Sequence, residues 1–272
     1  MRIKKYILII LFPAMSLFFD GCSSSTSPIN IFTAQDDVQL GTQLDQQIRS
    51  DPVQYPIYAY AEPNRYLQNM VNEIIKSPLI QYKGTFVYKS QIIKNDSVVN
   101  AFATPGGYVY VYTGLLKFVD NEATLAGILA HEIAHAELRH ATNRMTQKYG
   151  IDLMLQWILG NNPNQIAQIG ANLFEGLYLL KNSRDDETQA DEYSFKYLKT
   201  SKWYPAGILY FFEKIGKDRT QSSLEIWLST HPSDQQRTDD VKKLALDNQI
   251  PSPTESNIFS NSYRDFKNTM PK

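Results

Sequence analysis

Two histidines and a glutamate occur together in the segment His-Glu-Ile-Ala-His, which spans residues 131–135. Positions i and i+4 of a helix lie on one face, one turn apart, so His131 and His135 can bind the same metal ion. Glu132 lies about 100° around the helix from His131, beside that ion. There its carboxylate can take a proton from a metal-bound water and pass it to a leaving amine. The alternative is a pair of helical histidines beside a salt-bridging glutamate.

A catalytic zinc ion needs a third protein ligand and an open position for water. His140 is a poor candidate, because it lies about 140° around a continuous helix from His135 and points elsewhere. Glu187 is a better candidate, because a short helix at that point could offer its carboxylate to the metal. Asp191 follows one turn later and could orient a ligand imidazole by a hydrogen bond. Taken alone, an acidic pair at this spacing is typical of a solvated helix surface.

The sequence around these residues alternates between two periodicities. Apolar residues at helical spacing predict helices over 34–50, 64–76, 120–142, 166–180, 185–199 and 206–215, with another after Ser233. β-Branched and aromatic residues predict strands over 85–88, 98–103 and 108–113. Pro105-Gly106-Gly107 predicts the turn between the last two strands. The pattern therefore predicts a single α+β domain that is mostly helical and has a small β-sheet.

The composition excludes several classes of protein. The chain has 272 residues, with 27 basic and 28 acidic side chains and a formal charge of −1. Because this balance gives no electrostatic basis for nucleic-acid binding, we expect no nucleic-acid partner. A hydrophobic share of 43% is typical of a globular chain and excludes a wholly disordered one. The single cysteine, Cys22, excludes an intramolecular disulfide framework.

The first 21 residues have the pattern of a secretory signal peptide. Basic residues precede an apolar run over 6–19, which is too short to span a membrane, and Cys22 follows closely. This arrangement resembles a bacterial lipoprotein signal, which implies that Cys22 is lipidated and anchors the chain to a membrane. A free or buried thiol is the alternative. The expected organisation is a signal peptide over 1–21, a lipidated Cys and tether over 22–34, one domain over 35–250 and a C-terminal tail over 251–272.

Four stretches of the chain, taken together, resemble the zinc metallopeptidase family of HtpX and the CAAX prenyl proteases, in its soluble periplasmic lipoprotein branch. They are Asn100–Ala103 with Pro105–Gly107, the run over 131–141, Ser183–Asp191, and Ser229–Pro232 with Arg237. The motifs occur in the family's order. The resemblance implies a zincin-like domain with one Zn²⁺ per chain. It also implies zinc ligands at His131, His135 and Glu187, a general base at Glu132 and a ligand-orienting acid at Asp191.

The resemblance gives His231 two alternative roles. In the prenyl-protease relatives the positions of His231 and Arg237 face the substrate, which implies that both stabilise the oxyanion formed as water attacks. In lipoprotein relatives the same histidine can reach the zinc as a fourth ligand, which would fill the open position and hold the enzyme latent. A surface histidine beside a helix-starting proline is a third interpretation. We expect the fourth-ligand arrangement in the resting protein.

The strand after the Pro-Gly-Gly turn is the predicted substrate-binding element. By resemblance, this strand forms an edge beside the zinc, and its residues are Tyr108, Val109, Tyr110, Val111 and Tyr112. An extended substrate could add to such an edge as a further strand. A strand paired on both sides is the alternative. Residues 149–182 carry an apolar stripe that could cover the site, touch lipid or belong to the core.

The expected function is a zinc-dependent endopeptidase of the bacterial cell envelope, lipid-anchored in the periplasm at the outer membrane. Its expected substrates are misfolded or unassembled envelope proteins, hydrolysed by a zinc-activated water with Glu132 as general base. The alternative is a latent peptidase that acts mainly as a chaperone or assembly factor for outer-membrane proteins. A zinc hydrolase of small peptides or sugars would need a closed pocket in place of an exposed edge strand.

Overall fold

The computed structural model describes residues 30–150, 181–217, 222–232 and 235–270. Cys22, the signal segment and most of the predicted tether lie outside the described residues, as do residues 151–180 of the apolar stripe. Among the helices of the described part, none is both long enough and apolar enough to cross a membrane.

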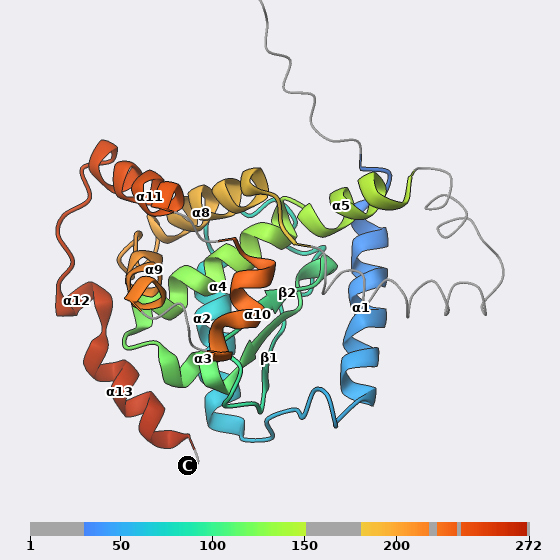
Figure 1. The fold of residues 1–272 in the computed structure, drawn as a ribbon, viewed down its shortest axis with the longest axis horizontal. Helices are drawn as coiled ribbons and strands as arrows, with labels where there is room; N and C mark the ends of the chain where they lie inside the picture. The colour runs from blue at the N-terminus through green and yellow to red at the C-terminus, as the bar shows by residue number, and fades with distance from the viewer. Residues whose placement is uncertain (1–29, 151–180, 218–221, 233–234, 271–272) are drawn as a thin grey trace, which may run out of the picture.

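Helices surround a small β-sheet in this part of the chain (Figure 1). The elements are α1 (Ala34–Ser50), α2 (Ala61–Ile74), β1 (Ser90–Ile93), β2 (Ala101–Ala103), the 3-10 turn η1 (Pro105–Gly107), β3 (Val109–Tyr112), α3 (Thr113–Phe118), α4 (Glu122–Glu137), α5 (His140–Tyr149), α8 (Arg184–Leu198), α9 (Ile208–Lys217), the 3-10 turn η2 (Ser222–Leu224), α10 (Glu225–Thr230), α11 (Gln235–Asp247), α12 (Glu255–Ile258) and α13 (Ser260–Thr269). This is the predominantly helical, zincin-like α+β domain that the sequence predicts.

The sheet has the strand order β1-β3-β2, so β3 is its central strand. β3 pairs in parallel with β1 and antiparallel with β2. This corrects the expectation that residues Tyr108 to Tyr112 form an edge, because a strand that the sequence pattern did not reveal, Ser90–Ile93, occupies the other side of β3. The edge that faces α4 belongs instead to β2, where the Ala103 N–H donates a hydrogen bond to Glu132 on α4 (3.1 Å).

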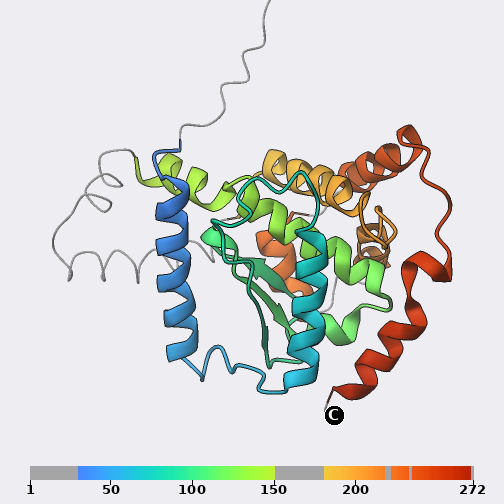
Figure 2. The ribbon, with the colours of Figure 1, turned by 180° about the vertical axis from the view of Figure 1, so that it is seen from behind.

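Helix α4 runs through the centre of the domain, between the sheet and helix α8 (Figures 1 and 2). Every residue of α4 is buried, and it begins where the Asn121 side chain accepts a hydrogen bond from the Thr124 N–H. Its small residues allow close packing: a Cβ at Gly127 would lie 2.6 Å from the backbone nitrogen of Ile208 on α9. Ser194 of α8 donates its hydroxyl to the Gly127 carbonyl, which joins α8 to α4.

The helix predicted over 120–142 is two helices in the structure. α4 ends at Glu137, Arg139 adopts a left-handed conformation with φ of 57°, and α5 begins at His140. The Arg139 guanidinium donates hydrogen bonds to the Asp37 carboxylate and to the Phe32 carbonyl, and these bonds hold the residue in its unusual conformation. The break changes the direction in which every side chain after Leu138 points.

The C-terminal residues are not a separate tail. Helices α12 and α13 pack onto the core, where Tyr263 is fully buried and donates its hydroxyl hydrogen to the Leu116 carbonyl (2.7 Å). Phe266 stacks on Tyr66 of α2 with ring centroids 3.9 Å apart. Residues 251–270 therefore belong to the same domain as the HEIAH helix.

Candidate metal centre

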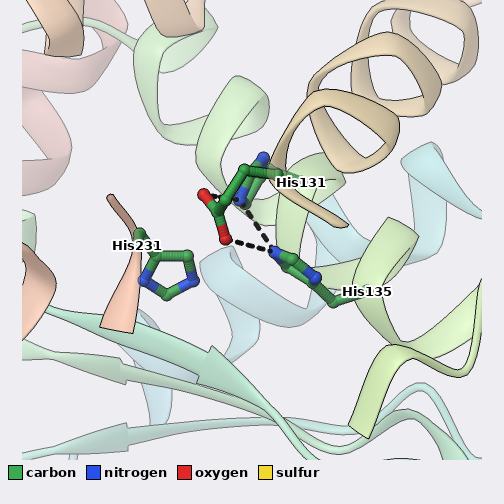
Figure 3. Close-up of side chains that lie close together, drawn as sticks. His131, His135 and His231 are labelled. Carbon is green, nitrogen blue, oxygen red and sulfur yellow. Dashed lines mark hydrogen bonds and ion pairs between the residues drawn. The ribbon is translucent and has the colours of Figure 1, made fainter. Parts of the chain in front are cut away.

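Four buried side chains from three elements converge at one point beneath α8. His131 and His135 come from α4, Glu187 from α8 and His231 from the C-terminal end of α10. One donor atom from each of the four lies within 4.8 Å of the other three. The Nε2 atoms of His131 and His135 are 3.0 Å apart, and the Glu187 carboxylate lies 3.5 Å and 3.3 Å from them. Figure 3 shows His131 and His135 directed toward one another, with His231 facing them from the other side.

This donor set fits a zinc ion. Two imidazole nitrogens one helical turn apart and one glutamate oxygen are the protein ligands of a common class of catalytic zinc site. The facing Nε2 atoms of His131 and His135 are both buried, and at most one of them can donate to the other. A cation between the four groups would give every one of these buried atoms a partner.

Helix capping places Glu187 in the first turn of α8. The Ser183 hydroxyl accepts from the Asp186 N–H, and the Asp186 carboxylate accepts from the Ser183 N–H. Glu187, the next residue, is fully buried against α4. Burial would raise the pKa of the Glu187 carboxyl, but the surrounding His231, His131, His135 and Arg237 lower it well below its ordinary value. Glu187 is therefore held as an anion, the form that a metal ligand requires.

The two histidines of α4 have different protonation tendencies in the metal-free protein. Burial lowers the pKa of His135 well below its ordinary value, so its ring is neutral. Burial also acts to lower the pKa of His131, but its close contacts with the carboxylates of Asp191 and Glu187 outweigh it and raise this pKa to about 9. A metal ion that binds His131 must therefore displace a proton.

Asp191 lies behind His131 and is itself held by an arginine. The Asp191 carboxylate is 2.8 Å from His131 Nδ1, and Arg237 donates two hydrogen bonds to it (2.7 and 2.8 Å). Burial would raise the pKa of Asp191, but the Arg237 charge lowers it. The acid that the resemblance assigned to ligand orientation is thus ionised and in contact with the imidazole.

The position of Arg237 corrects the expectation that it stabilises an oxyanion. Its guanidinium contacts Asp191, Glu187 (2.6 Å) and the Pro232 carbonyl, and only 4% of the side chain is exposed. Helix α11 packs against α8, so Arg237 reaches these carboxylates from behind the converging histidines. It balances two buried negative charges and does not line the cavity that borders Glu132.

His140 lies next to the site, although helical spacing predicted that it points elsewhere. The Nδ1 atoms of His135 and His140 are 2.8 Å apart, and both rings are buried. This contact exists because α4 ends before His140, so the angle expected for a continuous helix does not apply. Nothing in the apolar periodicity signals the break, which depends on the distant Asp37.

Asn182 is a second residue that the sequence did not reveal. Its side-chain amide donates a hydrogen bond to Glu187 Oε1 (2.5 Å) and lies 3.3 Å from His135 Nε2. Its backbone N–H bonds to the Thr230 carbonyl (3.1 Å), beside His231. Asn182 thus connects the start of α8 to the loop that carries His231. A signal for it was absent because an asparagine before a helix cap is an ordinary loop residue.

Glu132 and His231 face each other at the mouth of the site. His231 Nε2 lies 3.3 Å from Glu132 Oε1, and Glu132 Oε2 accepts the Ala103 N–H from β2. The His231 ring stacks on Trp227 with centroids 4.2 Å apart, and its Nδ1 contacts the Thr230 hydroxyl (2.9 Å). These contacts direct His231 Nε2 toward the other three donors. A cavity of about 80 Å³ borders Glu132, His135 and His231.

A model of peptidase family M48 matches residues 61–245 of the chain. The beta-barrel assembly-enhancing protease of Yersinia pestis is 28% identical over 258 residues, which cover 90% of this chain and 50% of that protein. Metalloprotease YcaL of Escherichia coli is 32% identical over 153 residues, covering 54% of this chain and 58% of that protein. The mitochondrial metalloendopeptidase OMA1 of Arabidopsis thaliana is 32% identical over 150 residues, covering 54% and 30%. The chain spans less than two thirds of the length of each of these relatives.

Proposed function

Because the chain belongs to peptidase family M48, we propose that it is a zinc-dependent endopeptidase of the bacterial cell envelope that hydrolyses misfolded or unassembled envelope proteins. The observation that carries the proposal is the convergence of His131, His135 and Glu187 on one buried point, with Glu132 beside it. A structural cluster of histidines would not need a carboxylate at the position of Glu132.

His131, His135 and Glu187 would hold the zinc ion in this mechanism. When bound, zinc would polarise the scissile carbonyl and lower the pKa of the attacking water. Glu132 takes the proton of that water and later passes it to the leaving amine. Asp191 fixes the orientation of His131, and Arg237 keeps Asp191 and Glu187 ionised although both are buried.

The outer edge of β2 is the place that we propose for an extended substrate. β2 is an edge strand of the described sheet, and its Ala103 N–H points to Glu132. Main-chain hydrogen bonds along such an edge make few demands on side chains, which suits unfolded proteins. The family resemblance predicts that the substrate pairs with the Tyr108–Tyr112 strand. Because β3 is central in the sheet, we propose its neighbour Ala101–Ala103 as the substrate-binding strand.

For His231, we propose a regulatory contact in the resting protein. One of its ring nitrogens lies within 4.8 Å of the other three donors, close enough to act as a fourth zinc ligand. In that position it would exclude water and keep the peptidase latent until the loop after α10 moves.

The sequence and the name of one relative support a proposed location. We propose that Cys22 carries a lipid anchor and that the domain faces the periplasm, bound to the outer membrane. One relative is named as a beta-barrel assembly-enhancing protease, which favours envelope proteins as partners and makes a chaperone or assembly role the second candidate function.

Degradation of an unfolded protein tests the proposal. The purified mature chain, residues 22–272, should degrade casein with zinc bound and lose this activity in a chelator, and added zinc should restore it. The Glu132→Gln variant separates the two candidate functions. A chaperone would still suppress aggregation of an unfolded outer-membrane protein in that variant, whereas a peptidase would lose its effect.

A further inference from the structure

Helix α1 lies outside the stretch that matches the family model, which begins at residue 61. Yet α1 packs directly on η1, the turn that leads from the edge strand β2 to β3. A Cβ at Gly41 would lie only 1.9 Å from the Pro105 carbonyl oxygen, and one at Gly106 would lie 2.8 Å from Val38 Cα. Because glycine has no Cβ at these two positions, the backbones of the helix and the turn can lie in direct contact.

Side-chain contacts fix α1 at its N-terminal end as well. The buried Asp37 carboxylate accepts hydrogen bonds from Arg139, at the break between α4 and α5. The same guanidinium reaches the Phe32 carbonyl. In Figure 2, α1 runs along one flank of the sheet and its upper end lies beside α5. The helix is thus attached both to the turn after β2 and to the end of the helix that carries His131 and His135.

This docking brings one side chain of α1 to the cavity at the site. Leu44 lines the same cavity as Glu132, His135 and His231, and it is 2% exposed. The other apolar lining residues are Phe102, Ala103, Pro105, Ala136 and Ala141. Arg144 also borders the cavity, but its charge is paired with Asp186 (3.1 Å). The remaining lining residues other than Glu132 and the two histidines are uncharged polar ones, Asn100, Thr104, Asn182 and Thr230. The apolar residues therefore form one wall of a cavity whose other lining is polar.

We propose that this cavity is a specificity pocket, that it receives a compact apolar side chain adjacent to the scissile bond, and that Leu44 of α1 limits the size of that side chain. The inference rests on the proposed peptidase function and deepens it. Main-chain pairing with β2 would accept any extended sequence, and Leu44 would select among the sequences that pair.

The expected size of the effect follows from the chemistry of apolar pockets. A difference of one methylene in a ligand changes selectivity by about 10- to 200-fold. Leu44→Ala removes a branched side chain from the wall and should admit aromatic residues. Leu44→Phe keeps the wall apolar but makes the pocket smaller, so it should admit only small substrate side chains such as that of Ala. Leu40→Ala is the matched control, because Leu40 is buried on the same helix one turn earlier and does not line the cavity.

The test compares cleavage of a denatured protein mixture by wild type and these three variants, with the residues flanking each cut read by mass spectrometry. Wild type should favour Ala, Val or Leu at one flanking position. Leu44→Ala should raise relative kcat/KM for Phe or Trp at that position by about tenfold or more. Leu40→Ala should reproduce the wild-type profile. Identical profiles for wild type and both Leu44 variants would overturn the proposal.

A binding measurement separates failure of this inference from failure of the proposed function. Fluorescent heptapeptides of alanine with one central Ala, Leu, Phe or Trp are titrated against the Glu132→Gln protein, with and without the Leu44 substitutions. The Leu44 substitutions should change the order of affinity among the four peptides, even though the Glu132→Gln protein cuts none of them. If neither wild type nor His231→Ala cleaves any peptide with zinc bound, but the Leu44 substitutions change the order of the affinities, the peptidase function is rejected and the pocket is supported. If wild type cleaves, but the Leu44 substitutions change neither the cleavage-site profile nor the peptide affinities, only the proposed specificity pocket is rejected.

Discussion

His135 and His140 contact each other through their Nδ1 atoms, which are 2.8 Å apart inside the protein. A zinc-binding imidazole that uses Nε2 must carry its proton on Nδ1, and that proton needs an acceptor. Asp191 meets this need for His131, whereas a second histidine meets it for His135. The two ligands of α4 are therefore oriented by different chemical groups.

The first prediction concerns His140. His140→Ala should weaken zinc binding by about 10- to 100-fold, because His135 loses the acceptor that fixes its ring. Competition with a chelator of known affinity measures the change. His140→Gln should recover part of the affinity through its amide oxygen, and Gln147→Ala, an exposed position of α5, should have no effect. Unchanged zinc affinity in His140→Ala would show that the contact is merely packing.

The second prediction distinguishes two roles for Arg237. Arg237→Leu removes a positive charge that the buried carboxylates of Asp191 and Glu187 contact. The free energy of unfolding should therefore fall by about 3–5 kcal/mol. Urea denaturation of the metal-free protein measures this loss. An oxyanion-stabilising arginine would behave differently. Its loss would lower kcat and leave the free energy of unfolding nearly unchanged.

The third prediction concerns His231. If this residue caps the zinc at rest, His231→Ala should raise basal cleavage of an unfolded substrate while zinc stays bound through the other three ligands. Loss of an oxyanion donor would instead lower kcat by about 10²–10³-fold. Initial rates on casein, together with metal content per chain, distinguish the two outcomes, and a fall of that size would reject the latency proposal.

The fourth prediction concerns the proposed anchor at Cys22. Cys22→Ala should move the protein from the membrane fraction to a soluble or uncleaved form, while the purified variant keeps its peptidase activity. Fractionation of cells followed by mass measurement of the N-terminal peptide tests this. A variant that is still cleaved and still equally membrane-bound would argue against lipidation.

Much of the local structure could be predicted because local signals determine it. The α1 bounds Ala34–Ser50 match the prediction, since Thr33 caps the helix and Leu40, Leu44 and Ile48 form one buried face. Helical spacing on α4 is also enough to place the imidazoles of His131 and His135 side by side. The position of Glu187 beside them depends on the packing of α8 against α4, and the sequence suggested it as a zinc ligand only through the family resemblance.

What could not be predicted depends on contacts between distant residues. The strand Ser90–Ile93 lacks a clear polar–apolar alternation, so the sequence did not predict it. Because this strand pairs with β3, β3 is central and β2 is the edge strand beside α4. The predicted strand at 85–88 is a loop, in which Phe86 and Tyr88 are buried by side-chain packing. The break at Arg139 depends on Asp37, which is 102 residues away in the chain. Without that break, His140 would not reach His135.

The most direct test of the central claim is the metal content and activity of Glu132→Gln. Glutamine has nearly the shape of glutamate but cannot take a proton, and the three proposed zinc ligands remain. The variant should bind one zinc per chain, measured by atomic absorption, and its casein cleavage should fall by at least about 10²-fold. His135→Ala, as the comparison, should lose both zinc and activity. Stoichiometric zinc with undiminished cleavage in Glu132→Gln would contradict the proposed mechanism.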